Sequence, residues 1–178
     1  GGAFTIYGQG FGAVGPLSRV LLGDTPIPFT SWSDTQISVS VPATTARGPR
    51  QLSILAQNGK RTVNGLTFHV RGPGYEPVVY QVGPGRAYAT IQSAVNDAAA
   101  QPGSNALVVV FPGAPVQWNP SGVYYENVIL YAPVKLQGVG PGGVRNNGSS
   151  VLGSVIDGRG VAGDATYAED WRVFVESL

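Results

Sequence analysis

Residues 36–42 read QISVSVP, a strict alternation of polar and apolar side chains that stops at a proline. Successive side chains of a β-strand point to opposite faces of a sheet, so the isoleucine and both valines would enter a core while the serines face water. A proline cannot donate a backbone hydrogen bond within a sheet, so the strand should end before it. We therefore predict a half-buried β-strand at 36–41.

Further short stretches with strand character surround this one and are separated by glycines and prolines. We predict strands at 4–7, 19–22, 51–57 and 62–70. The last two flank residues 57–60, QNGK, and the Asn-Gly pair favours the positive φ angles of a type I′ hairpin turn. Short strands at this spacing predict an antiparallel β-sandwich.

The order of motifs in this part of the chain also resembles a known family. The motifs are Gly10-Phe11, residues 20–23 (VLLG), 33–37 (SDTQI), 41–42 (VP) and 68–70 (FHV). They resemble the IPT/TIG domain, an immunoglobulin-like fold named after plexins and transcription factors. Members of that family usually open with a further proline-containing strand. The resemblance therefore implies a sandwich over residues 1–70 that lacks an edge strand or borrows one.

The pattern changes after a segment rich in glycine and proline. We predict a linker at 71–85, which includes a short strand at 78–82. Apolar residues at helical spacing then predict an amphipathic helix at 90–100, with Thr90 as its N-cap. A continuously apolar strand at 107–111 would be buried on both faces.

The remaining strands suggest a repeating architecture. We predict them at 126–131, 134–137 and 154–156. The tripeptides LQG at 136–138 and IDG at 156–158 lie 20 residues apart, and a strand-plus-glycine repeat of that length suggests stacked coils of a solenoid.

Five motifs of this half resemble the start of the right-handed parallel β-helix of the pectin-lyase-like superfamily. They are residues 88–95 (YATIQSAV), 110–113 (VFPG), 123–128 (VYYENV), 134–138 (VKLQG) and 155–158 (VIDG). The resemblance implies a capping α-helix and the first coils of a β-helix over 86–178. The expected fold class is thus mainly β: an immunoglobulin-like β-sandwich, a linker, and the start of a β-helix.

Composition excludes several kinds of site. The chain of 178 residues has no Cys and a single His, so disulfides, thiolate zinc sites and paired-histidine sites are excluded. A formal net charge of +1 gives no electrostatic drive towards nucleic acid or anionic membranes. No apolar run approaches the ~20 residues of a membrane span. We expect no cofactor, no metal, no nucleic acid and no membrane insertion.

Acidic residues offer two candidate sites. Glu126 and Asp157 suggest a carboxylate pair for acid/base sugar chemistry. The resemblance instead assigns both to the fold, and we expect no catalytic residue in this chain. Asp164, Glu169 and Asp170 suggest calcium binding, but they lack a regular loop pattern and a solvated tail is favoured.

The basic residues and the histidine offer a further candidate. Arg47, Arg50, Lys60 and Arg61 surround the predicted hairpin and would form a weakly basic patch, too weak to bind DNA. Alternation places His69 opposite its apolar neighbours, so we expect a lone exposed histidine.

An inserted loop at 114–122 carries the candidate glycan contacts Trp118, Asn119 and, beside it, Tyr124. An aromatic ring flanked by amides suits a sugar, because the ring covers the apolar face and the amides bind hydroxyls. The alternative is that Trp118 packs the loop onto the solenoid, and we favour it because tryptophan is mostly buried.

These observations predict a non-catalytic structural or adhesive module of a bacterial cell-surface or secreted protein, with a glycan or another protein as partner. An incomplete solenoid exposes its last coil, so we expect an oligomer or a larger assembly. The apolar segment 168–178, which contains Trp171, would then cover that coil or mark a cut edge. The alternative is the N-terminal part of a polysaccharide lyase or esterase whose catalytic coils lie outside this chain.

Overall fold

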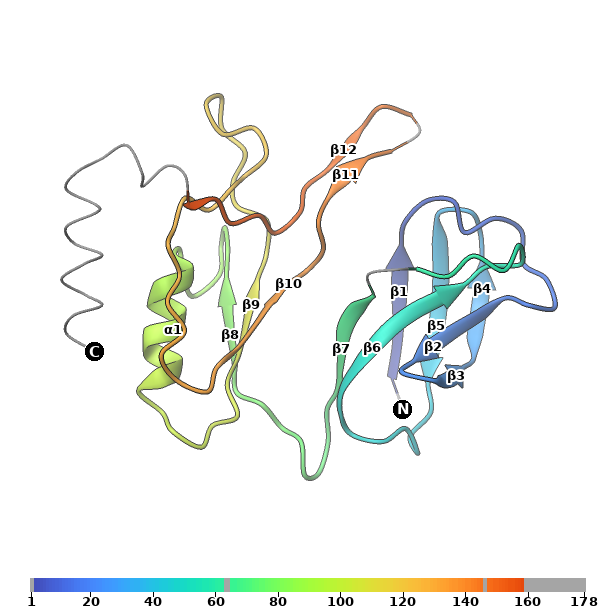
Figure 1. Cartoon of the computed structure of the whole chain (residues 1–178), viewed down its shortest axis with the longest axis horizontal. Helices are drawn as coiled ribbons and strands as arrows, with labels where there is room; N and C mark the ends of the chain where they lie inside the picture. Colours follow the sequence, from blue (N-terminus) through green and yellow to red (C-terminus); the bar gives the residue numbers. More distant parts are fainter. Residues whose placement is uncertain (1, 63–64, 146, 159–178) are drawn as a thin grey trace. The chain divides into compact units, whose positions relative to one another are not determined.

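The computed structural model describes residues 2–62, 65–145 and 147–158. Its chain divides into two compact units, Gly1–Glu76 and Pro77–Leu178. In their described residues, both are built mainly from β-strands, and the second also contains one short helix (Figure 1). No helix of the described residues is long and apolar enough to cross a membrane.

The N-terminal unit consists of two antiparallel sheets that share one core. One sheet has the order β1-β5-β4, formed by Gly2–Tyr7, Gln36–Val41 and Phe29–Trp32. The other has the order β3-β2-β6-β7, formed by Thr25–Ile27, Arg19–Leu22, Gly48–Leu55 and Leu66–Val70. Side chains from both sheets form a single apolar cluster, which is the arrangement of an immunoglobulin-like sandwich.

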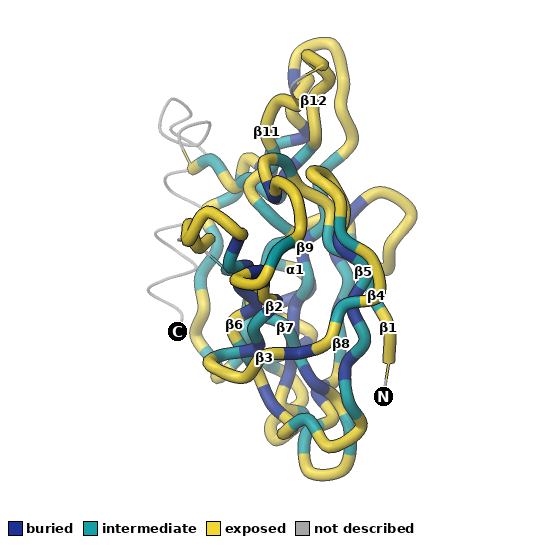
Figure 2. The backbone as a smooth tube through the Cα atoms, turned by 90° about the vertical axis from the view of Figure 1, so that its right-hand side faces the viewer, coloured by how far each residue is buried: buried dark blue, intermediate teal, exposed yellow. Residues whose placement is uncertain are grey.

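The burial of side chains along β5 confirms the strand that was predicted at 36–41. Ile37 is fully buried, and Val39 and Val41 are nearly so, while the two serines between them are partly exposed. Figure 2 shows buried positions recurring along the strands of this unit. The alternation therefore fixes which face of β5 enters the core.

Two strands were not predicted because prolines interrupt their sequence. Pro26 lies within β3 and Pro28 directly precedes β4. Both strands are the outermost members of their sheets, and an edge strand tolerates proline because the outward N–H has no ladder partner to lose.

The predicted type I′ turn at 57–60 is wrong. A type I′ turn needs positive φ at both Asn58 and Gly59. Gly59 has a positive φ of 79°, but Asn105 is the only described residue other than glycine with a positive φ, so Asn58 is not left-handed. The Gly59 N–H donates to the carbonyl of Ala56 at 3.0 Å, and the Asn58 side chain accepts the N–H of Lys60. This is a type I turn followed by a left-handed glycine, the usual form of a slightly longer hairpin loop.

The C-terminal unit contains a parallel sheet in the order β10-β9-β8, formed by Lys135–Gly138, Leu107–Val110 and Val79–Val82. Helix α1, Ile91–Ala99, connects β8 to β9 and packs on the sheet (Figure 1). A small hairpin, β11 (Gly143–Val144) and β12 (Ser150–Val151), follows β10. Strand β8 lies in the segment predicted as a linker, yet it belongs to this sheet.

The parallel strands stack with a constant step along the sequence. Val79 lies beside Leu107, and Leu107 lies beside Lys135, so each strand pairs with residues 28 positions later. The predicted 20-residue repeat is wrong, because β10 pairs with β9 whereas Ile156 forms a separate parallel bridge with Tyr124. The described residues do not close into a solenoid.

Helix α1 follows its prediction closely. Thr90 is the N-cap, and its side-chain oxygen accepts the N–H of Ser93. The buried face consists of Ile91, Ala94, Val95 and Ala98, which join the core formed by the parallel sheet.

No strand forms at 126–131, where one was predicted. The backbone of Ile129 instead pairs with a side chain of α1: its N–H donates to Gln92 Oε1 and its carbonyl accepts from Gln92 Nε2. One glutamine thus provides the hydrogen bonds that a neighbouring strand would have supplied.

Candidate functional site: an exposed aromatic pair

The inserted loop is closed on itself at its base. Gly113 N–H donates to the carbonyl of Gly122 at 2.9 Å, and a Cβ on Gly113 would lie 2.6 Å from that carbonyl oxygen. Val116 and Asn119 exchange backbone hydrogen bonds across a two-residue turn whose second residue is Trp118. The loop therefore has internal structure, and its tip presents a tryptophan.

Trp118 is 75% exposed, the most exposed large hydrophobic residue described. Its indole ring stacks on the ring of Tyr125, with centroids 6.2 Å apart and an interplanar angle of 28°. The favoured interpretation, that Trp118 packs the loop onto a solenoid, is therefore wrong. The ring contacts another partly exposed aromatic residue and leaves much of its surface to solvent.

Asn119 is buried and holds the loop. Its amide donates to the carbonyl of Val123 and its oxygen accepts the Val123 N–H, both at 2.9 Å. Because both ends of the amide bond to backbone, Asn119 does not present hydrogen-bonding groups to a ligand in this structure. The sequence-based assignment of Asn119 as a glycan contact needs this correction.

Tyr124 is also internal. Its hydroxyl donates to the carbonyl of Phe111 at 3.0 Å and its side chain is 8% exposed. Burial raises the pKa of this phenol, and the nearby Glu126 carboxylate raises it further. Tyr124 therefore supports the loop from beneath. The next residue, Tyr125, takes the exposed position, as alternation along an extended segment would suggest.

Glu126 has a structural role. Its Oε1 accepts the N–H of Ile91 and its Oε2 accepts the N–H of Gln92, each at 2.9 Å. These are among the first N–H groups of α1, which have no partners within a helix, and the negative charge complements the helix dipole. This confirms the interpretation of Glu126 as part of the fold.

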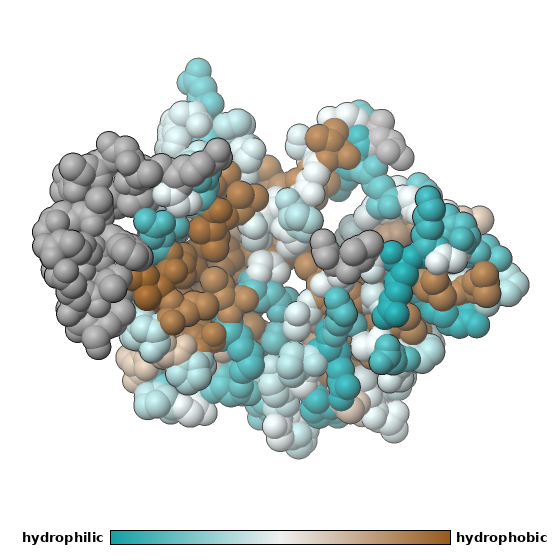
Figure 3. Space-filling model, viewed as in Figure 1, coloured by the Kyte–Doolittle hydropathy of each residue, from teal (hydrophilic) through white to brown (hydrophobic). Residues whose placement is uncertain are grey.

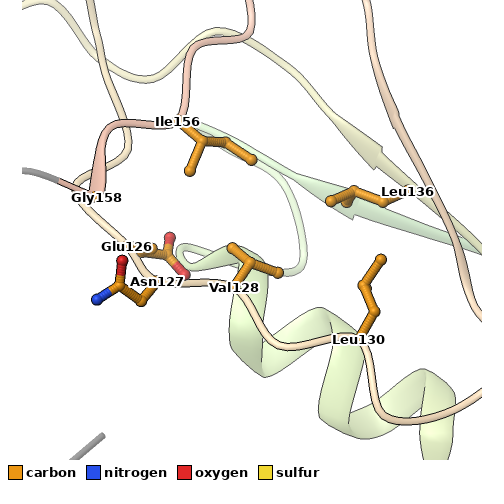
Figure 4. A pocket seen from close by; sticks show the side chains of 7 residues that line it. All are labelled: Glu126, Asn127, Val128, Leu130, Leu136, Ile156 and Gly158. Carbon is orange, nitrogen blue, oxygen red and sulfur yellow. The ribbon is translucent and has the colours of Figure 1, made fainter.

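An apolar recess lies near Glu126. It has a volume of about 670 Å³ and is lined by Val128, Leu130, Leu136 and Ile156, with Glu126, Asn127 and Gly158 at its rim (Figure 4). Leu130 and Ile156 are 50% and 43% exposed. Figure 3 shows apolar side chains at the surface of this part of the unit. Val128 and Leu136 also pack against the apolar core of this unit, so the recess adjoins that core.

His69 is not a lone exposed residue. It is half-buried, its Nδ1 lies 2.6 Å from the hydroxyl of Tyr75, and the two rings stack. Burial raises the pKa of the Tyr75 phenol. The pair joins the end of β7 to the segment that follows it.

Two sequence-based assignments lie outside the described residues: the acidic cluster Asp164, Glu169 and Asp170, and the apolar segment 168–178 with Trp171. Within the described part of the chain, no group of three or more His, Cys, Asp or Glu side chains is placed to hold a metal ion.

Comparison with known proteins bears on the N-terminal unit. Residues 1–70 match the family model of the IPT/TIG domain. No curated protein matches the chain. The match agrees with the two-sheet sandwich, and the IPT/TIG domain is a generic immunoglobulin-like module with structural or adhesive roles.

Proposed function

We propose that this chain is a non-catalytic adhesive module that contacts a glycan through Trp118 and Tyr125. The exposed, stacked aromatic pair is the observation that carries this proposal. Aromatic rings bind the apolar faces of sugars, and here one ring supports the other. The loop that carries Trp118 is braced by the buried Asn119, so little conformational entropy would be lost when a ligand binds.

We also propose that the C-terminal unit begins a right-handed parallel β-helix. Supporting observations are the three parallel strands in chain order, their constant 28-residue step and the helix between the first two of them. Tyr124 and Ile156 form a second parallel contact, in which the later segment again lies beside the earlier one. Each coil would thus contribute one strand to the sheet and one extended segment to a second face.

The setting that fits these features is a bacterial cell-surface or secreted protein. The immunoglobulin-like module supports an extended architecture, and the chain has few charges and no Cys. The apolar recess below β10 offers an apolar surface to a second molecule, so we propose that the chain works as an oligomer or as part of a larger assembly.

The proposed glycan contact is tested by titrating the full chain with neutral and acidic polysaccharides and measuring binding by isothermal titration calorimetry, which does not use the Trp118 ring as its reporter. A single aromatic site should bind in the millimolar range, about 4 kcal/mol. Trp118→Ala should abolish binding. Tyr7→Ala, which removes another highly exposed aromatic ring in the N-terminal unit, is the matched control and should bind normally. Equal binding by all three proteins would refute the assignment.

A further inference from the structure

The tip of the Trp118 loop presents an amide beside the aromatic ring. Val116 and Asn119 bond to each other through their backbones, so Gln117 and Trp118 are the two central residues of the turn. The side chain of Gln117 is exposed, and its amide bonds to no other described residue. Both ends of the Asn119 amide bond to backbone, so Gln117 is the amide available to a ligand.

The tip owes its exposure to the closed loop and not to an unpaired strand. Figure 1 shows the loop projecting beyond the end of β9. The segment that leaves the loop already has its partner, because the Tyr124 N–H donates to the carbonyl of Val155 at 2.9 Å and the Tyr124 carbonyl accepts the Asp157 N–H at 2.8 Å. The turn at Gln117 and Trp118 therefore lies outside the paired segments of this unit.

The segment that carries the tip has no charge. Residues 112–125 contain no Asp, Glu, Lys, Arg or His. Their exposed hydrogen-bonding side chains are those of Gln117, Ser121 and Tyr125. Glu126 follows directly, but both of its carboxylate oxygens accept N–H groups of α1. The segment thus offers a ligand an aromatic ring together with neutral donors and acceptors.

Neutral sugars match this combination of groups. An amide has a donor and an acceptor, so Gln117 can bond to hydroxyls at the edge of a sugar whose apolar face lies on Trp118. A sugar carboxylate would need Arg or Lys, which form charge-assisted hydrogen bonds with it. Residues 112–125 provide neither, so a uronate would lose water around its charge and gain no partner there.

We propose that the Trp118 loop selects neutral sugars over acidic ones and that Gln117 binds their hydroxyl groups. This inference rests on the glycan contact proposed above and adds the class of ligand. The sugar would lie on the Trp118 ring, with its hydroxyls towards the Gln117 amide. Uronate sugars would bind weakly because the tip has no cation for them.

The probes are tetrasaccharides of β-linked glucose, mannose and galactose. Each has a matched form in which the primary alcohol of every unit is oxidised to a carboxylate, so the two forms of a pair share their linkage and differ in charge. Isothermal titration calorimetry of the full chain at low salt should show millimolar binding of at least one neutral tetrasaccharide. Its oxidised form should bind at least about fivefold more weakly.

Variants at position 117 separate the hydrogen bonds from the charge. Gln117→Ala removes the amide and should weaken binding of the neutral sugar about fivefold. Gln101→Ala removes another exposed amide of the same unit and should leave binding unchanged. Gln117→Lys supplies a cation and should strengthen binding of the oxidised sugar about fivefold at low salt, a gain that high salt removes.

The outcomes distinguish this inference from the function on which it rests. If no sugar binds, or if Trp118→Ala binds as well as the unaltered chain, the glycan contact itself is wrong and the inference falls with it. If Trp118→Ala abolishes binding but neutral and oxidised sugars bind equally, the contact stands and the selection for neutral sugars is overturned. Normal binding by Gln117→Ala would overturn the role of Gln117.

Discussion

Glu126 binds the first turn of α1 from 35 residues away, accepting the Ile91 N–H at 2.9 Å through one carboxylate oxygen. Its other oxygen accepts the next N–H of the helix. We expect Glu126→Ala to lower the free energy of unfolding by about 2–3 kcal/mol, because two charge-assisted hydrogen bonds are lost. Glu126→Gln keeps an acceptor and should cost less. Chemical denaturation measures both, and equal stability of all three proteins would contradict this role.

The Trp118 loop allows exposed and buried neighbours to be compared. Trp118→Ala should change the free energy of unfolding by no more than about 0.5 kcal/mol, because its ring is mostly in water. Asn119→Ala should cost about 1–3 kcal/mol, since the part-buried N–H and carbonyl of Val123 both lose their partner. Thermal melts of the two variants provide the measurement, and the reverse order would mean that the ring, not the amide, braces the loop.

Alkaline pH should destabilise the C-terminal unit through Tyr124. Its pKa is raised in the folded chain, so the folded state holds the phenol proton more tightly than the unfolded state does. The stabilisation that the Tyr124 phenol contributes is fully present below the unfolded pKa of about 10, and it is lost as pH rises through the pKa of the folded state. Tyr124→Phe should be less stable at neutral pH but show a shallower decline above pH 10. An unchanged decline would assign the effect to other groups.

The recess below β10 should promote association. Light scattering of the unaltered chain at micromolar concentration should give a mass above that of a monomer. Leu130→Glu places a charge in the recess and should restore the monomer. Leu17→Glu, at a similarly exposed leucine of the N-terminal unit, should not. A monomeric unaltered chain would show that the recess needs no second molecule.

The chain should show no lyase or hydrolase activity on pectin or related glycans. Both carboxylate oxygens of Glu126 accept backbone N–H groups of α1, so this residue is not available for acid/base chemistry. Assays for unsaturated and reducing ends provide the test. Turnover that disappears in Asp157→Asn would instead favour the enzyme alternative.

Sequence reasoning succeeded where one local signal decided the outcome. The alternation at 36–41 and the helical spacing after Thr90 each specify a buried face, and the structure shows both. Sequence reasoning failed where contacts with residues far away in the sequence determined the local structure. Residues 126–131 have the composition of a strand, but Gln92 of α1 bonds to the backbone of Ile129 and no strand forms.

The candidate site shows the same division. The loop and its tryptophan were identified from composition, but the exposure of Trp118 depends on Tyr125 and on a base closed between Gly113 and Gly122. None of these contacts is visible as a sequence motif. Average burial of tryptophan therefore gave the wrong expectation for this residue.

The closed base of the Trp118 loop also makes it a natural grafting position. Gly113 and Gly122 are joined by a 2.9 Å hydrogen bond, so the eight residues between them begin and end at nearly the same point in space. A replacement peptide of different length and sequence would start and finish at this one junction without pulling β9 away from β10. The loop could then be randomised in a display library, with the parallel sheet as a constant scaffold.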